Sequence, residues 1–157
     1  MSAAAISAFF SPGQACQEAI LEHIENASTS LDICVFTISD DHIARAIYDA
    51  FGRGIQIRLI TDNEKLLDKG SDIVELAKSG IEIRVDQSPN HMHHKFMVKD
   101  AAFVLTGSYN WTRSAALYNH ENVITINDAS LAGVYLTAFE DLWQTCIPFT
   151  QNDWNNR

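Results

Sequence analysis

The hydrophobic positions along the chain repeat with two different periods, which separates predicted helices from predicted strands. Apolar residues recur every three or four positions in four stretches, and each stretch predicts an amphipathic helix. These helices are expected over residues 15–24, 43–51, 71 or 72 to 80, and 131–142. Ser39 or Asp40 can cap the second helix. The core-facing side of the last helix is predicted to consist of Leu131, Val134, Tyr135, Ala138 and Leu142.

Short apolar runs between these helices predict strands. Leu31–Ile38 and Ile55–Thr61 are runs typical of buried strands, whereas residues 81–86 alternate as in a half-exposed strand. Further strands are expected at Lys95–Val98, Ala102–Thr106 and Asn122–Ile126. A helix connects the first two strands as a crossover. The fold class is therefore predicted to be α/β, with a mixed sheet covered by helices on both faces.

The size of the chain favours one domain. With 157 residues and 46% hydrophobic residues, it can bury one good core but would be cramped as two. We expect a single domain over residues 1–157, with its core at about 4–147. The segment Lys65–Gly70 and a tail over residues 148–157 are expected to be the loosest parts.

The chain shows neither a membrane-spanning pattern nor a disulfide framework. No run of 18 apolar residues is present, and Met1–Phe10 lacks the basic residues of a signal peptide. The cysteines are odd in number, far apart and never in a C-x-x-C spacing: Cys16, Cys34 and Cys146. We therefore expect a cytoplasmic protein in a reducing compartment.

The charge is unevenly distributed. The formal net charge of -9 is unfavourable for binding phosphate backbones, which proteins contact largely through Lys and Arg. However, ten of the eleven basic residues and nine of the twenty acids lie between Arg45 and Arg113, a local balance of +1. The middle of the chain is therefore the part expected to face an anion.

A cluster of polar residues lies at the ends of the later predicted strands. Its groups are His91–Lys95, Asp100, Gly107–Asn110 and His120–Asn122. If the chain is extended at its first group, His93 and Lys95 point to one face about 7 Å apart, at ~3.3 Å per residue. An imidazole and an ammonium then share one pocket.

This pair suits attack on a phosphodiester. A neutral imidazole can be the nucleophile, while Lys95 offsets charge on the non-bridging oxygens. Ser108 and Asn110 can donate hydrogen bonds to the same oxygens. A carboxylate such as Glu121 can hold the imidazole of His93 in the required tautomer.

Two other interpretations apply to residues near this cluster. His91, His93 and His94 have a spacing that allows metal binding. Lys95 would set a cation against the metal, and no acid lies within four residues, so we predict neither a metal nor a cofactor. The aromatic residues Tyr109 and Trp111 could stack on bases or lipid, or belong to the core.

The spacing of these residues resembles a family signature. His93-x-Lys95, Asp100 and Gly107-Ser108-x-Asn110 match H-x-K-x4-D-x6-G-S-x-N, the signature of the phospholipase D superfamily, at every position. The resemblance covers about residues 4–143. It is strongest to small bacterial endonucleases and to mitochondrial cardiolipin hydrolases of the Zucchini type.

The resemblance implies roles for individual residues. His93 would attack phosphorus to form a phosphohistidine, Lys95, Ser108 and Asn110 would hold the phosphoryl oxygens, and Glu121 would orient His93. Strand alternation places Asp100 opposite Lys95, so this member of the motif is expected to support the scaffold through a hydrogen bond or an ion pair.

Three functions agree with these residues. The first is a metal-independent endonuclease that cleaves DNA or RNA, since the motif contacts phosphate and not base edges. The second is a phospholipase D or cardiolipin hydrolase, which is less favoured because no basic amphipathic helix is present. The third is a non-catalytic nucleic-acid-binding module, against which the complete motif argues.

The presence of one motif copy predicts a homodimer. In-line displacement needs a nucleophile on one side of phosphorus and a general acid on the other. One His93 cannot stand on both sides. A two-fold axis through a shared active site would supply the second copy.

Overall fold

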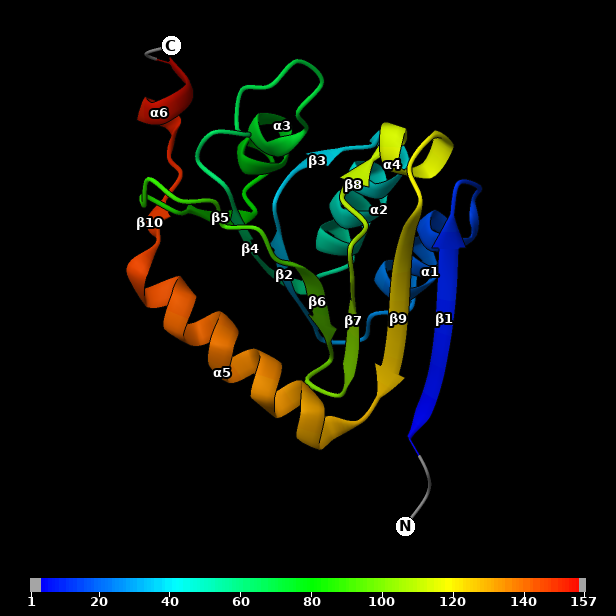
Figure 1. Ribbon diagram of the computed structural model, residues 1–157. Helices are drawn as coiled ribbons and strands as arrows, with labels where there is room; N and C mark the ends of the chain where they lie inside the picture. The colour runs from blue at the N-terminus through cyan, green and yellow to red at the C-terminus, as the bar shows by residue number, and fades with distance from the viewer. Residues whose placement is uncertain (1–3, 156–157) are drawn as a thin grey trace.

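The structure, a computed structural model, describes residues 4–155 and is built on one large mixed sheet (Figure 1). Its eight strands lie in the order β1-β9-β7-β6-β2-β4-β5-β10. Their bounds are β1 Ala5–Ser11, β2 Ser30–Val35, β4 Gln56–Thr61, β5 Glu82–Val85, β6 Lys95–Lys99, β7 Phe103–Gly107, β9 Glu121–Asn127 and β10 Ile147–Pro148. A separate two-stranded sheet joins β3 (Ile38–Ser39) to β8 (Trp111–Thr112).

Helices cover both faces of the large sheet, which confirms the predicted fold class (Figure 1). The helices are α1 Ala15–Glu25, α2 Asp41–Gly52, α3 Ile73–Lys78, α4 Arg113–Leu117, α5 Ala129–Thr145 and α6 Gln151–Asn155. Alternation along the strands separates the two layers, because successive side chains point to opposite faces. On β6, Met97 packs into the cluster that includes α1 and α2, whereas Phe96 and Val98 pack toward α5.

The predicted crossover is present at the centre of the sheet. Strands β2 and β4 pair in parallel, and α2 lies between them in the sequence. The side chain of Asp40 caps α2 by accepting hydrogen bonds from the backbone N–H groups of His42 and Ile43. None of the helices over residues 4–155 combines the length and the apolar character that crossing a bilayer requires.

The first strand was not predicted. Residues 5–11 form β1 at the edge of the sheet and pair antiparallel with β9. Its outer positions, such as Ile6 and Phe10, remain exposed although they are apolar. Because apolar residues occupy its exposed positions, the segment lacks the alternation of apolar and polar residues by which a half-buried strand is identified.

Three other predictions differ from the structure. The strand expected over 31–38 stops at Val35, because the chain then leaves the large sheet to form β3. Helix α5 turns Ala132, Phe139 and Trp143 inward, whereas Val134 of the predicted face is 64% exposed. The tail expected to be loose from residue 148 instead pairs with β5 and buries Phe149, whose apolar ring joins the main core. Residues 156 and 157 of that tail lie outside the described residues.

A close approach between β7 and β9 explains the glycine of the Gly-Ser pair. Gly107 lies opposite Val123, and a Cβ atom at Gly107 would overlap the backbone carbonyl of Asn122. The position therefore excludes every side chain.

We predict that Gly107→Ala lowers the free energy of unfolding by about 1–3 kcal/mol, the usual cost of overpacking. Gly133→Ala is the matched control, because Gly133 lies in α5 and its Cβ would meet no atom within 4 Å. Urea unfolding should show the control to be neutral or more stable, since alanine favours helix. Equal stability of the two variants would contradict this explanation.

Asp100 connects the end of β6 to the start of β2. Its carboxylate accepts hydrogen bonds of 2.7–3.1 Å from the backbone N–H groups of Ser28, Thr29 and Ser30 and from the Thr29 hydroxyl. Burial raises the pKa of Asp100, but these hydrogen bonds outweigh burial and hold the pKa below its ordinary value of 3.8.

We predict that Asp100→Asn costs about 1–2 kcal/mol of stability at neutral pH, because an amide is a weaker acceptor than a carboxylate and the site is partly solvated. Asn also tolerates the positive φ of 53° found here. Since the folded-state pKa is depressed, the ionised carboxylate stabilises the fold above the ordinary value, and this advantage disappears as pH falls through the folded-state pKa. Urea unfolding at several pH values should show the difference from wild type narrowing below pH 3.8. A difference that is independent of pH would contradict the assignment.

Candidate active site

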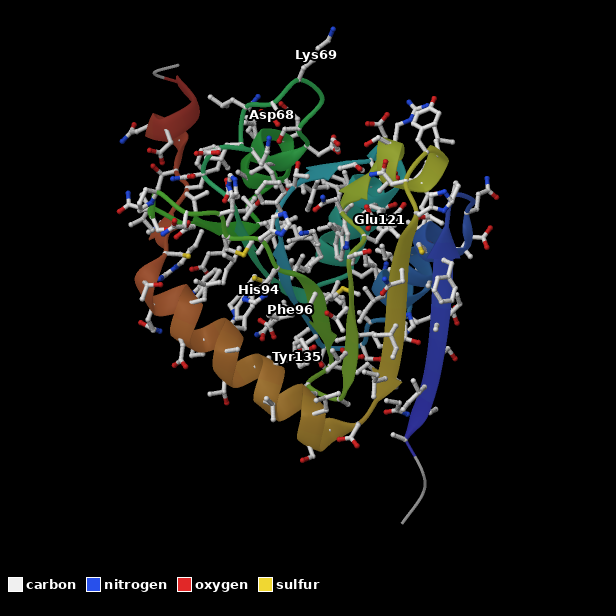
Figure 2. The ribbon with its side chains drawn as sticks, in the orientation of Figure 1. Asp68, Lys69, His94, Phe96, Glu121 and Tyr135 are labelled. Carbon is white, nitrogen blue, oxygen red and sulfur yellow. The ribbon has the colours of Figure 1, made fainter. Side chains whose placement is uncertain are left out.

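Three strand ends meet at one edge of the sheet and bring the predicted site residues together. Strands β6 and β7 are antiparallel, so the start of β6 at Lys95 lies beside the end of β7 at Gly107. Strand β9 is antiparallel to β7 in turn, and its first residue, Glu121, lies at the same edge (Figure 2). His93 precedes β6, and Ser108 follows β7.

His93 and Lys95 form the pair that their spacing predicts. The ammonium Nζ of Lys95 lies 3.0 Å from Nδ1 of His93 and donates a hydrogen bond of 2.7 Å to the backbone carbonyl of His93. The His93 ring is exposed, whereas Lys95 is buried. The imidazole of His93 is therefore accessible to solvent, and the buried ammonium of Lys95 lies next to its Nδ1.

Burial and charge act on both groups. Desolvation, followed by the charge of Lys95, lowers the pKa of His93 below 6.5. Desolvation likewise lowers the pKa of Lys95 below 10.5, although the carboxylate of Glu121 opposes this shift. The lowered pKa of His93 favours a neutral ring at neutral pH, which is the form a nucleophile needs.

Phe36 was not predicted as part of the site. Its ring centroid lies 4.8 Å from that of His93 and 5.5 Å from Nζ of Lys95. Its backbone N–H donates to the carbonyl of His94. Phe36 is therefore a positioning residue that holds both members of the pair. The sequence contains no signal for it, because the contact depends on how β2 and β6 pair.

Among residues 4–155, Glu121 makes neither a hydrogen bond nor an ion pair with His93, so its role in orienting this ring stays a prediction. Its carboxylate accepts a short hydrogen bond from the Ser108 hydroxyl and lies 3.4 Å from the side-chain nitrogen of Asn119. The reason is the strand order, since β7 separates β9 from β6. Ser108 also accepts a hydrogen bond from the backbone N–H of Asn122.

The turn after β7 places its residues in two environments. Asn110 is half-buried, and its side-chain oxygen has no hydrogen-bond partner among residues 4–155. Tyr109 and Trp111 are buried in the main core, so the interpretation that they stack on bases or lipid is wrong. Asp100 lies at the far end of β6, ~16 Å from Lys95 at 3.3 Å per residue, and the structure does not bring it to the site.

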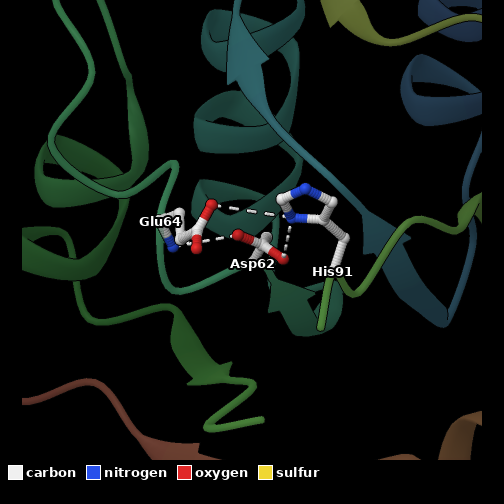
Figure 3. A group of neighbouring side chains, drawn as sticks. All are labelled: Asp62, Glu64 and His91. Atoms are coloured by element: carbon white, nitrogen blue, oxygen red, sulfur yellow. Dashed lines mark hydrogen bonds and ion pairs between the residues drawn. The ribbon is translucent and has the colours of Figure 1, made fainter. Parts of the chain in front are cut away.

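The three neighbouring histidines do not converge on one point. The ring centroids of His91 and His93 are 6.2 Å apart, and the ring of His94 instead packs against Phe96 (Figure 2). Although no acid lies within four residues of them in the sequence, folding places Asp62 and Glu64 beside His91 (Figure 3).

A cleft of about 420 Å³ opens beside the nucleophile candidate. It is lined by Asp86, Ser88, His91, Met92, His93, His94 and Leu142. The cleft gives a substrate access to the exposed His93 ring.

Comparison with known proteins agrees with these features. Residues 20–143 match the family model described as "Cardiolipin synthase, PLD-like domain". A mitochondrial cardiolipin hydrolase from Chlamydomonas reinhardtii is 40% identical over 123 residues, which cover 78% of this chain and 55% of that protein. A phospholipase D from Rickettsia bellii is 37% identical over 136 residues, or 87% of this chain and 68% of that protein.

The fold agrees equally well with a solved structure. Nuc from Salmonella typhimurium, a phospholipase D family member, superimposes with a TM-score of 0.88 at 25% identity, covering 95% of this chain and all of that one. The chain spans only about half the length of several cardiolipin hydrolases that it matches, for example 54% of the human protein. The family model nevertheless matches most of the chain, and the protein belongs to the phospholipase D superfamily.

Proposed function

We propose that the protein is a metal-independent phosphodiesterase that cleaves nucleic acid through a phosphohistidine at His93. The observation that carries this proposal is the exposed imidazole of His93, whose Nδ1 lies 3.0 Å from Nζ of Lys95 and whose lowered pKa favours the neutral ring. A non-catalytic binding module would have no need of a lowered nucleophile pKa at the mouth of a cleft.

The chemistry places a condition on the ring proton of His93. For Nε2 to attack phosphorus, Nδ1 must carry the ring proton and donate a hydrogen bond to an acceptor. In the described chain Nδ1 faces the ammonium of Lys95, which can only donate. A substrate phosphate would draw this ammonium to its non-bridging oxygens. A carboxylate acceptor for Nδ1 is then needed, and among residues 4–155 Glu121 bonds to Ser108 and Asn119 instead of His93.

A second copy of the chain would meet this requirement. Two copies related by a two-fold axis through the site would supply Glu121 as the acceptor and a second His93 as the general acid. The first His93 would form the bond to phosphorus while the second protonates the leaving oxygen. The second His93 would then take a proton from water, which attacks phosphorus and releases the first His93.

Two observations bear on the substrate. The relatives named cardiolipin hydrolases favour a phospholipid as the second candidate. Against this, α1 and α5 contain neither Lys nor Arg, so neither provides the basic amphipathic surface that binds anionic lipid. We therefore favour single- or double-stranded nucleic acid.

A panel of substrates tests the proposal directly. Protein treated with excess EDTA should cleave single-stranded DNA, RNA or duplex DNA faster than it hydrolyses cardiolipin in vesicles. His93→Ala should lower the rate at least about 1000-fold, as removal of a nucleophile does in other enzymes. His42→Ala is the matched control and should keep the wild-type rate, because His42 is an exposed residue of α2.

The possible outcomes separate the candidates. Hydrolysis of cardiolipin with nucleic acid left intact would replace the nuclease proposal with the phospholipid one. Absolute dependence on added metal, or a folded His93→Ala variant with a tenth of the activity, would overturn the mechanism.

A further inference from the structure

Three potential metal ligands from distant parts of the sequence converge beside the proposed active site (Figure 3). Asp62 and Glu64 follow β4, and His91 lies in the segment before β6. Nδ1 of His91 is 3.7 Å from a carboxylate oxygen of Asp62 and 3.6 Å from one of Glu64. One ligand atom from each residue lies within 4.8 Å of the other two.

These separations suit a bound ion better than direct hydrogen bonds. Ligands at ~2.1 Å from a tetrahedral metal are ~3.4 Å from one another. The two distances from His91 are close to this value, and both are too long for a hydrogen bond. One imidazole nitrogen with two carboxylate oxygens is a donor set that Zn²⁺ accepts.

Asp62 is held in place as a metal ligand would be. Its side chain is completely buried, and its two oxygens accept hydrogen bonds from the backbone N–H groups of Glu64 and Met92, at 2.9 and 2.8 Å. Each carboxylate oxygen has a second lone pair, so both can still coordinate. The hydrogen bond to Met92 also ties β4 to the residue between His91 and His93, and such outer contacts orient ligands in known sites.

The lysine that follows Glu64 in the sequence does not neutralise the two acids by an ion pair. Lys65 pairs with Asp68 at 3.0 Å. The ion pairs of Asp62 and Glu64 among residues 4–155 are those with His91. Two carboxylates thus meet at one histidine, an arrangement that a divalent cation would stabilise.

We infer that Asp62, Glu64 and His91 bind a divalent transition-metal ion of the Zn²⁺ class, and that this ion inhibits the enzyme. His91 and His93 line the same cleft with their ring centroids 6.2 Å apart. An ion with its remaining water ligands would occupy the approach to His93 and compete with the substrate. Binding does not depend on the proposed function, whereas the inhibition rests on it.

Zn²⁺ binding by tag-free, EDTA-treated and dialysed protein tests the first part. Isothermal titration with Zn²⁺ alone should give one site per chain, and Zn²⁺ should raise the melting temperature. The His91 ring lies edge-on to Phe36 with the centroids 5.4 Å apart, so His91→Phe keeps a ring there but removes the nitrogen, and Glu64→Gln removes one charge. Both variants should bind at least about tenfold more weakly, because each loses a direct ligand. These two residues are exposed, so the substitutions should not disturb folding as one at Asp62 would.

Matched controls distinguish this site from its neighbours. His94→Phe and Glu75→Gln should bind Zn²⁺ as the wild type does, and Mg²⁺ should not compete, since it prefers octahedral oxygen sites. Unchanged affinity in His91→Phe, or loss of binding in His94→Phe, would overturn the assignment.

The inhibition is measured on the best substrate of the panel. Zn²⁺ should raise KM for the wild type by at least about tenfold while leaving kcat unchanged, and His91→Phe should resist it. Binding without any change in KM would overturn the inhibitory role alone. A protein inactive on every substrate would refute the proposed function, while the titration would still decide whether the site exists.

Discussion

Strand β6 is held in one register by the hydrogen bonds of both its neighbours, and the geometry of the site depends on this register. Val35 of β2 lies opposite Lys95, and Thr106 of β7 lies opposite Phe96. A slip of one residue would turn His93 and Lys95 together to the other face of the sheet, away from Phe36. The same register places Phe36, which follows β2, against the ring of His93 and the ammonium of Lys95. The central sheet therefore orients the His93-Lys95 pair without any contact from substrate.

The sequence predicts the parts of this arrangement that are local along the chain. The His93-Lys95 spacing, the helix cap at Asp40 and the crossover from β2 to β4 follow from short-range patterns, and the structure contains all three. Contacts between strands were not predictable in this way. Phe36 and Asp62 reach the site only through strand pairing, and the inward face of α5 is determined by packing of Phe139 and Trp143. Spacing also does not reveal that β7 lies between the strand of Glu121 and the strand of Lys95.

The acidic character of the chain is compatible with an anionic substrate only if charge is concentrated locally. The formal charge of -9 contrasts with the local balance of +1 between Arg45 and Arg113. Two copies meeting at the site would double the Lys95 cations around one phosphate and provide the acceptor that His93 lacks in one copy. The absence of such an acceptor within the described chain and the need for a second imidazole thus point to the same assembly, for different physical reasons.

The most direct test of this shared site is the activity of mixed dimers. Sedimentation first establishes whether the protein is dimeric at the assay concentration. Wild type is then mixed with increasing His93→Ala under conditions that allow subunits to exchange. If each site needs both His93 side chains, the activity per wild-type chain should fall in proportion to the wild-type fraction, because mixed dimers are inactive. Constant activity per wild-type chain, or a fully active monomer, would contradict the account.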